Sequence, residues 1–245
     1  MRLAVVIPMY NEEVGARRCL ERVQSATADF NNPVSLIAVD DGSSDSTVKV
    51  LRELLADGRH FELVEGGRNR GYGGALRLGA LRAQELGADW VLFIDSDLTN
   101  PPEQIPAFIA AVAPGVNFVK ASRYGKGGDT GDVPFKRVLV SRVGNLVARV
   151  LMGIPHSDLT NGFRAFELRT YLDLPLTENG FGVILEEMYY ARVSGLRGAS
   201  IPGHLTNRST DLRPTSFRYS WKQIWQYLRW PLRTAAMRPR LFLRR

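Results

Sequence analysis

The chain has 245 residues, of which 44% are hydrophobic and 23% are charged, so it can bury a large apolar core as a single domain. A single cysteine, Cys19, excludes an internal disulfide framework, and the longest apolar stretch, residues 138–155, is interrupted by Arg142 and Arg149 and predicts no membrane span. The net charge is +7, but residues 208–245 alone carry +9 and residues 1–207 carry −2, which predicts a polyanionic partner for the C-terminal end only.

Short apolar runs alternate with amphipathic segments through the first half of the chain. Residues 3–8 are apolar throughout and predict a buried strand, and residues 12–28 predict a helix whose core face carries Val14, Cys19 and Val23. The same patterns predict strands at 34–39, 61–64, 90–94 and 116–121, and helices at 46–55, 74–86 and 102–112. Apolar strands separated by amphipathic helices indicate an α/β fold, with a mostly parallel sheet covered by helices on both faces.

Polar, acidic and glycine-rich residues gather in the loops that follow the predicted strands. Right-handed crossovers place these loops at one edge of a parallel sheet, which is where ligands bind in folds of this class. The sequence therefore predicts one binding edge built from five loops: Pro8-Met-Tyr-Asn-Glu12, residues 40–45, residues 65–74, Asp95-Ser-Asp97 and residues 122–128.

Asp95 and Asp97 follow the apolar strand predicted at 90–94. Residues two apart on an extended chain project to the same side, so both carboxylates can face one point. Carboxylates that close repel each other unless a cation lies between them, and Mg²⁺ or Mn²⁺ prefers hard oxygen ligands of this kind. The alternative is that the two aspartates only cap the helix that follows Pro101.

Two further loops have polar groups suited to a nucleotide. Asp41 can accept hydrogen bonds from ribose hydroxyls or a base N–H, while Asp45 or Ser46 caps the next helix. Residues 71–74 open a helix with free N–H groups and form a candidate anion site. Their spacing departs from Gly-x-Gly-x-x-Gly at Leu76, which disfavours a nicotinamide-dependent dehydrogenase.

Taken together, the loops resemble a known family. Residues 8–12, 39–43, 69–74 and 95–98 are similar to the motifs of the inverting family 2 glycosyltransferases, which have the Rossmann-like GT-A fold. Later segments resemble the dolichyl- and polyprenyl-phosphate sugar synthases, such as dolichol-phosphate mannose synthases: Ser122-Arg-Tyr124, Lys136-Arg137, Ser141-Arg-Val-Gly-Asn145, Asp158-Leu-Thr-Asn-Gly-Phe-Arg164 and Glu187-Met188. The resemblance implies a GT-A domain over residues 1–210, followed by a basic amphipathic segment over residues 211–245.

The resemblance also implies roles for particular residues. The nucleotide-sugar would contact the first two loops, the aspartate loop and one C-terminal arginine: Pro8, Tyr10, Glu12, Val39, Asp41, Ser96 and Arg208. Asp95 and Asp97 would act in catalysis as ligands of Mg²⁺ or Mn²⁺. Arg123, as a further catalytic residue, would meet the acceptor phosphate together with Arg137 and Ser141. The alternative for these arginines is solvated surface charge.

The sequence departs from the family pattern at two places. Thr99 stands where the family usually has a glutamine that serves as a further metal ligand. The family's Gly-Glu-Ser-Lys segment is also missing after Arg208, which leaves Arg213 and Arg218 as candidates for the role of its lysine. Both departures leave the identity of the donor sugar and of the acceptor open.

The basic C-terminal segment has helical periodicity, with apolar residues on one side and cations on the other: Phe217, Trp221, Ile224, Trp225 and Leu228 against Arg218, Lys222 and Arg229. This pattern suits a helix in the interface of an anionic membrane over residues 217–245, and Pro231 is expected to end or kink it. The alternative is a helix packed on the domain with this stripe as core. Many relatives continue into transmembrane helices after this point, whereas this sequence predicts none. The chain is therefore expected to lie peripherally on the cytoplasmic membrane face or to use a separate membrane subunit.

These observations predict a metal-dependent inverting glycosyltransferase that moves a sugar from GDP-mannose or a UDP-hexose to a polyprenyl or dolichyl phosphate. One alternative keeps the fold but uses a hydroxyl acceptor, with Glu186 or Glu187 as the general base. Another is a non-catalytic module that binds nucleotide at the sheet edge and binds membrane or nucleic acid through the tail, where Trp221, Trp225 and Trp230 could stack on bases. Nucleic acid is the less expected partner.

Overall fold

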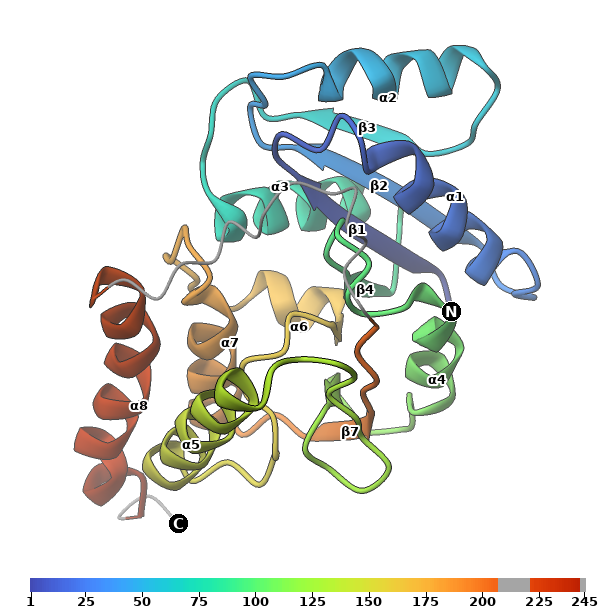
Figure 1. Cartoon of the computed structure of the whole chain (residues 1–245). Coiled ribbons are helices and arrows are strands. Elements are labelled where there is room, and N and C mark those ends of the chain that lie inside the picture. Colours follow the sequence, from blue (N-terminus) through green and yellow to red (C-terminus); the bar gives the residue numbers. More distant parts are fainter. Residues whose placement is uncertain (207–220, 243–245) are drawn as a thin grey trace.

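The structure is a computed structural model that describes residues 1–206 and 221–242 of the chain (Figure 1). The described strands form one seven-stranded sheet in the order β3-β2-β1-β4-β6-β5-β7. The strands are β1 (Leu3–Met9), β2 (Val34–Asp40), β3 (Glu62–Glu65), β4 (Trp90–Phe93), β5 (Phe118–Ser122), β6 (Arg164–Glu167) and β7 (Gly198–Pro202). The helices are α1 (Ala16–Thr27), α2 (Thr47–Ala56), α3 (Tyr72–Glu85), the 3-10 turn η1 (Pro102–Gln104), α4 (Ile105–Ala110), α5 (Phe135–Met152), α6 (Leu168–Leu172), α7 (Val183–Val193) and α8 (Trp221–Phe242). The predicted α/β fold is confirmed.

Helices cover both faces of the sheet because alternate residues of each strand point in opposite directions. Val6 of β1 packs in a cluster with α3, α6 and α7, whereas Val5 packs in a second cluster with α1, α2 and α4. Helix α3 lies very close to the sheet, since a Cβ atom added at Gly79 would come within 2.3 Å of Val6 Cγ1. Cys19 is buried in the second cluster, as predicted.

The parallel strands end at one edge of the sheet. Met9 of β1 pairs with Asp40 of β2, and Asp40 pairs with Glu65 of β3, so the loops after these strands begin side by side. Strand β4 runs parallel to β1, and β6 is antiparallel to both β4 and β5, so β4 and β5 point the same way. The predicted gathering of the post-strand loops is therefore confirmed. The sequence did not predict β6, because its four residues include Arg164 and Glu167 and form no apolar run.

Helix α1 begins later than predicted. The carbonyl of Glu12 accepts hydrogen bonds from the N–H groups of Gly15 (3.0 Å) and Ala16 (2.8 Å), so a turn precedes the helix. Val14 lies in this turn and is 64% exposed, so its predicted place on the core face is wrong. The remaining predicted positions of that face, among them Cys19 and Val23, are buried.

Helix α8 packs against α5 and α7, and the three helices lie together at one end of the molecule, away from α1 and α2 (Figure 1). Among the side chains of α8 that the structure describes, those of Trp230, Pro231 and Thr234 are buried. The helix continues through Pro231, so the prediction that Pro231 ends it is wrong. On either side of the proline, Thr234 Oγ1 donates to the carbonyl of Trp230 (2.8 Å).

Two residues of the predicted apolar stripe are described, and both are exposed: Trp225 (61%) and Leu228. The side chains of Trp221 and Ile224 and all of Phe217 lie outside the described residues. The described part of α8 is therefore packed on the domain through residues other than these two. Among the described helices, none is long and apolar enough to cross a membrane.

Candidate active site

Asp95 and Asp97 lie at the carboxyl end of β4, both half-buried, with Ser96 buried between them. Asp95 Oδ1 accepts a hydrogen bond from the hydroxyl of Tyr72 (2.9 Å), and Asp97 Oδ1 accepts one from the N–H of Thr99 (3.0 Å). The turn η1 that follows has no side-chain cap. The alternative that these aspartates merely cap the next helix is therefore wrong.

The electrostatics of this loop favour a bound cation. Burial, and then the neighbouring charge of Asp97, raise the pKa of Asp95 to about 6. The described residues contain no group of three or more carboxylate, histidine or cysteine ligands. Two carboxylates with hard oxygen atoms fit Mg²⁺ or Mn²⁺, which commonly takes one or two protein carboxylates and completes its shell with phosphate oxygens and water.

Asp41 links the second and third loops. Its Oδ1 accepts a hydrogen bond from the N–H of Arg70 (2.7 Å), and burial raises its pKa. Gly42 packs so tightly on the third loop that a Cβ atom there would lie 2.4 Å from the carbonyl carbon of Arg68. Asp45 accepts a hydrogen bond from the N–H of Thr47 (3.0 Å), the first residue of α2, which is the capping contact predicted for it.

The other residues of the predicted nucleotide site differ in how far they are exposed to a ligand. Pro8 and Tyr10 are half-buried at the end of β1, and Glu12 is buried, with its N–H bonded to Thr47 Oγ1 (2.7 Å). Val39 is fully buried, and its backbone lies within the sheet, where it pairs with Pro8 of β1 and Val64 of β3. Arg208 lies outside the described residues, as do Arg213 and Arg218.

The candidate anion site at residues 71–74 is partly closed by the chain itself. The N–H of Gly73 donates to the carbonyl of Asn179 (2.8 Å), and a Cβ atom at Gly71 would lie 2.3 Å from that same oxygen. The segment around Asn179 therefore takes up one of the N–H groups that an anion would need.

Arg123 is anchored, not solvated. Its guanidinium donates to both carboxylate oxygens of Asp158 (2.6 and 2.9 Å) and to Thr160 Oγ1 (3.0 Å). Burial raises the pKa of Asp158, but the charge and hydrogen bonds of Arg123 outweigh it and hold that pKa below the usual value. The ring of Tyr124 lies between Arg123 and Arg142, 5.0 and 5.5 Å from their guanidinium carbons. The alternative that Arg123 is a solvated surface charge is therefore wrong.

Arg123, Arg137 and Ser141 line one cavity of about 480 Å³ between α5 and α8, here called the α5–α8 cavity. Arg137 is exposed and Ser141 is half-buried on α5. The walls are otherwise mostly apolar, with contributions from Val138, Ala148, Leu185, Leu205, Leu228 and Pro231. The structure thus brings together the three residues predicted for the acceptor phosphate.

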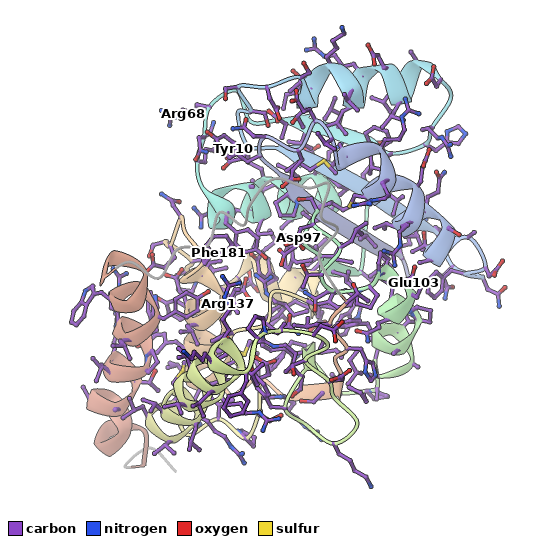
Figure 2. The ribbon with its side chains drawn as sticks, in the orientation of Figure 1. Tyr10, Arg68, Asp97, Glu103, Arg137 and Phe181 are labelled. Carbon is purple, nitrogen blue, oxygen red and sulfur yellow. The ribbon has the colours of Figure 1, made fainter. Side chains whose placement is uncertain are left out.

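A short segment joins the α5–α8 cavity to the aspartate loop. Thr160 contacts Arg123, and two residues later Gly162 lies against Asp95, where a Cβ atom would come 2.8 Å from Asp95 Oδ2. Figure 2 shows both Asp97 and Arg137 near the middle of the molecule, with Asp97 above Arg137 in that view. Asp158 and Thr160 belong to the motif at 158–164, but their role in holding Arg123 was not predicted. The motif alone does not reveal that Arg123, 35 positions earlier in the chain, lies next to it.

Glu186 and Glu187 are both fully buried on α7. Glu187 forms a paired interaction with Arg164 (2.6 and 2.7 Å), and Glu186 accepts hydrogen bonds from Thr177 and from the N–H of Glu178 (2.8 Å). Neither carboxylate faces the cavity as a free base, so the prediction that one of them deprotonates a hydroxyl acceptor is wrong. Trp230 is also buried, which removes it from the tryptophans proposed to stack on nucleic-acid bases.

The sheet, its acidic edge and the adjoining cavity define an α/β protein with a candidate ligand site at the carboxyl ends of its strands. Residues 4–171 match the description "Glycosyl transferase family 2", and the chain belongs to this family. The resemblance inferred from the motifs is confirmed.

Two relatives are similar along most of their length. The chain is 27% identical to polyprenol monophosphomannose synthase from Mycolicibacterium smegmatis, over 95% of this chain and 88% of the relative. It is 28% identical to undecaprenyl-phosphate mannosyltransferase from Micrococcus luteus, over 99% of this chain and 100% of the relative. It is also 29% identical to dolichol-phosphate mannosyltransferase from Pyrococcus furiosus, over 79% of this chain and 54% of that protein.

Solved structures show the same fold. Glucosyl-3-phosphoglycerate synthase from Mycobacterium tuberculosis superimposes with a TM-score of 0.66 at 23% identity, covering 97% of this chain and 80% of that one. A structure of that enzyme with Mg²⁺ and uridine diphosphate gives a TM-score of 0.63, covering 87% and 72% of the two chains.

Proposed function

We propose that this chain transfers a sugar from a nucleotide-sugar to a polyprenyl phosphate, with inversion at the anomeric carbon and with Mg²⁺ or Mn²⁺ as cofactor. The observation that carries the proposal is the α5–α8 cavity, whose mostly apolar lining also includes Arg123, Arg137 and Ser141. Residues 160–162 join it to the aspartate loop. A lining that combines apolar side chains with cations fits an isoprenoid chain with a phosphate head. The relatives named for polyprenol-, undecaprenyl- and dolichol-phosphate sugar transfer support the same substrate class.

On the donor side, we assign the nucleotide to the loops after β1 and β2, through Pro8, Tyr10, Glu12 and Asp41, with the buried Val39 supporting them from within the sheet. Asp95 and Asp97 would hold the metal ion, with Ser96 and Arg208 near the sugar diphosphate. When bound, the ion would neutralise charge that develops on the departing nucleoside diphosphate. Thr99 adds no carboxylate to this set, so phosphate oxygens and water would complete the shell.

On the acceptor side, the chemistry needs positioning more than proton removal. An oxygen of the acceptor phosphate forms the bond to the anomeric carbon, while the bond from that carbon to the donor phosphate oxygen breaks and the nucleoside diphosphate leaves with the electron pair. The acceptor is already anionic, so no general base is required, in agreement with the burial of Glu186 and Glu187. Arg123 is held rigid by Asp158, which suits it to orient the phosphate.

We also propose that the chain lies on an anionic membrane, on its cytoplasmic face. Helix α5 exposes large apolar side chains along its length and carries only cations among its charged residues: Phe135, Leu139, Val140, Val143, Leu146, Val147 and Val150 with Lys136, Arg137, Arg142 and Arg149. Helix α8 adds the exposed Trp225, Leu228 and Leu232, within the segment 217–245 that the sequence predicts to meet the membrane. Leu228 also lines the α5–α8 cavity, so the proposed contact surface adjoins the proposed acceptor site. A separate membrane subunit remains a prediction from the sequence.

A transfer assay tests the proposed activity. The full chain would be incubated with Mn²⁺, undecaprenyl phosphate in detergent, and labelled GDP-mannose or UDP-glucose in parallel, and the label extracted into organic solvent. We expect metal-dependent transfer from one donor into the lipid phase. Transfer to a hydroxyl acceptor but not to the lipid phosphate would contradict the proposed acceptor, and failure of EDTA to reduce transfer would contradict the metal role.

A further inference from the structure

Behind the aspartate loop, a buried chain of side chains ends on Asp95. The Tyr72 hydroxyl donates to Asp95 Oδ1 (2.9 Å), and Arg164 Nη1 donates to the Tyr72 oxygen (3.2 Å). Glu187 holds Arg164 through both carboxylate oxygens (2.6 and 2.7 Å), and neither Arg164 nor Glu187 has any exposed surface. Since Arg164 can only donate, the Tyr72 oxygen accepts from it and the hydroxyl proton points to Asp95.

The neighbours of Tyr72 fix its hydroxyl in place. Tyr72 is the first residue of α3, and its ring stacks on Phe181 with centroids 4.8 Å apart. Phe181 lies beside the same central region as Asp97 in Figure 2. The ring therefore cannot swing away without losing this stacking.

Gly162 closes the other side of the niche that holds Asp95. A Cβ atom at this position would lie 2.8 Å from Asp95 Oδ2 and 3.1 Å from the Tyr72 hydroxyl. Arg164 Nη1 also donates to the carbonyl of Gly162 (2.6 Å), which fixes the backbone that forms this wall. The Asp95 carboxylate is thus confined by a hydrogen bond on one oxygen and by close backbone contact on the other.

We propose that Tyr72 is a positioning residue, held by Arg164 and Glu187, that sets the orientation of the Asp95 carboxylate toward the divalent ion. This inference rests on the metal role assigned to Asp95 in the proposed function. Groups that hydrogen-bond a metal ligand fix its orientation, and their removal typically weakens metal binding about 10- to 100-fold. Glu187 therefore has a role through Arg164 and Tyr72 without touching a substrate.

The test is the variant Tyr72→Phe, which keeps the ring on Phe181 and removes only the hydroxyl. Mn²⁺ affinity would be measured by electron paramagnetic resonance of the free ion, with and without GDP or UDP. We expect Mn²⁺ affinity to fall about 10-fold or more, with a raised KM for the donor and an unchanged KM for the lipid phosphate. The matched control is Tyr190→Phe, since Tyr190 packs beside Tyr189 and Trp230 on the α7–α8 contact, and it should leave Mn²⁺ affinity unchanged.

A double-mutant cycle separates positioning from a general structural effect. In an Asp95→Ala background, Tyr72→Phe should produce no further loss of nucleoside diphosphate affinity in Mn²⁺, because the group that Tyr72 orients is gone. Equal losses in both backgrounds would overturn the inference, as would wild-type Mn²⁺ affinity in Tyr72→Phe. Absence of sugar transfer by the wild-type chain would instead overturn the proposed function, while Mn²⁺ binding would still decide the role of Tyr72. A wild-type chain that transfers sugar but binds no Mn²⁺ would overturn the inference and the metal role on which it rests, while the proposed sugar transfer would stand.

Discussion

At the scale of single residues, the charged groups near the sheet edge are held by specific partners. Arg123 is paired with Asp158, Arg164 is paired with Glu187, and Lys120 donates to the carbonyl of Asn161. A buried charge without such partners would shift its pKa or destabilise the fold. Because these partners fix the side chains, the cationic and acidic groups of the site keep their relative positions before any ligand binds.

Asp97 provides the most direct test of the metal role. Asp97→Ala removes one of the two carboxylates and is expected to lower kcat/KM about 100-fold or more, because charge on the leaving diphosphate loses its stabilisation. The exposed Asp173 offers a matched control, and Asp173→Ala should leave the rate unchanged. Circular dichroism would verify that both variants fold, and full activity of folded Asp97→Ala would refute the metal role.

Lys120 gives a prediction for stability. Burial, and then the charge of Arg164, lower its pKa to about 7 in the folded chain, whereas a lysine of the unfolded chain keeps its ordinary pKa of 10.5. Between these two values the unfolded chain binds more protons than the folded chain, so this residue makes the free energy of unfolding rise with pH. The charges of Asp158 and Glu187 oppose this lowering of the Lys120 pKa, and the charge of Arg123 adds to it.

Denaturant unfolding of the wild type and of Lys120→Met would be compared from pH 7 to 10. The difference between their free energies of unfolding should change with pH, with the wild type gaining relative to the variant as the pH rises. Parallel curves over this range would show that the buried lysine does not titrate there.

At the scale of elements, a buried tryptophan and its polar contacts join α8 to the domain. Trp230 is 1% exposed, lies 5.2 Å from the ring of Tyr189, and donates through Nε1 to Glu178 (2.9 Å). Glu178 also pairs with Arg229 (2.8 Å). This contact places Trp230, which is not part of the predicted stripe, on the packed side of α8.

Truncation of this anchor should destabilise the chain. We expect Trp230→Ala to lower the free energy of unfolding by about 3–5 kcal/mol, the usual range for removal of a buried tryptophan. Trp225→Ala is the matched control, because Trp225 is 61% exposed, and it should change stability by less than about 0.5 kcal/mol. Equal stability of the two variants in urea denaturation would show that α8 does not pack as described.

At the scale of the whole molecule, exposed apolar side chains and cations gather on α5 and α8, next to the α5–α8 cavity. The most exposed of them, Phe135, is 77% exposed, at the first position of α5. A large apolar surface of this kind is unusual for a protein without a partner. Together with the cations of α5 it suits an anionic lipid surface better than a neutral one.

Vesicle flotation tests this surface. The chain should bind vesicles of phosphatidylglycerol more tightly than vesicles of phosphatidylcholine, and binding should weaken as salt rises. A double substitution on α5, Val143→Glu with Leu146→Glu, should weaken binding about 10-fold or more, whereas Leu81→Glu on α3, an equally exposed apolar site, should not. Equal binding of both variants would show that α5 is not the contact surface.

The sequence by itself determined the parallel sheet, its helical layers and the edge where the loops meet. Continuous apolar runs such as that of β1 can only be buried on both faces, and parallel strands then end at one edge. The same local reasoning placed Asp95 and Asp97 together, since two residues of one loop need no distant contact to become neighbours. The family motifs added Arg123, Arg137 and Ser141, which the structure brings to one cavity.

Only the tertiary structure decided which charges are paired and which faces are covered. Arg123 meets Asp158 across 35 positions of sequence, and Tyr72 meets Arg164 across 92, so no local periodicity could reveal these contacts. The same holds for Glu186 and Glu187, which the sequence offers as bases and the fold buries as anchors. In α8, the helix continues through Pro231 with the neighbouring Trp230 buried, while Trp225 of the predicted stripe is exposed, because burial depends on which surface a neighbouring helix presents.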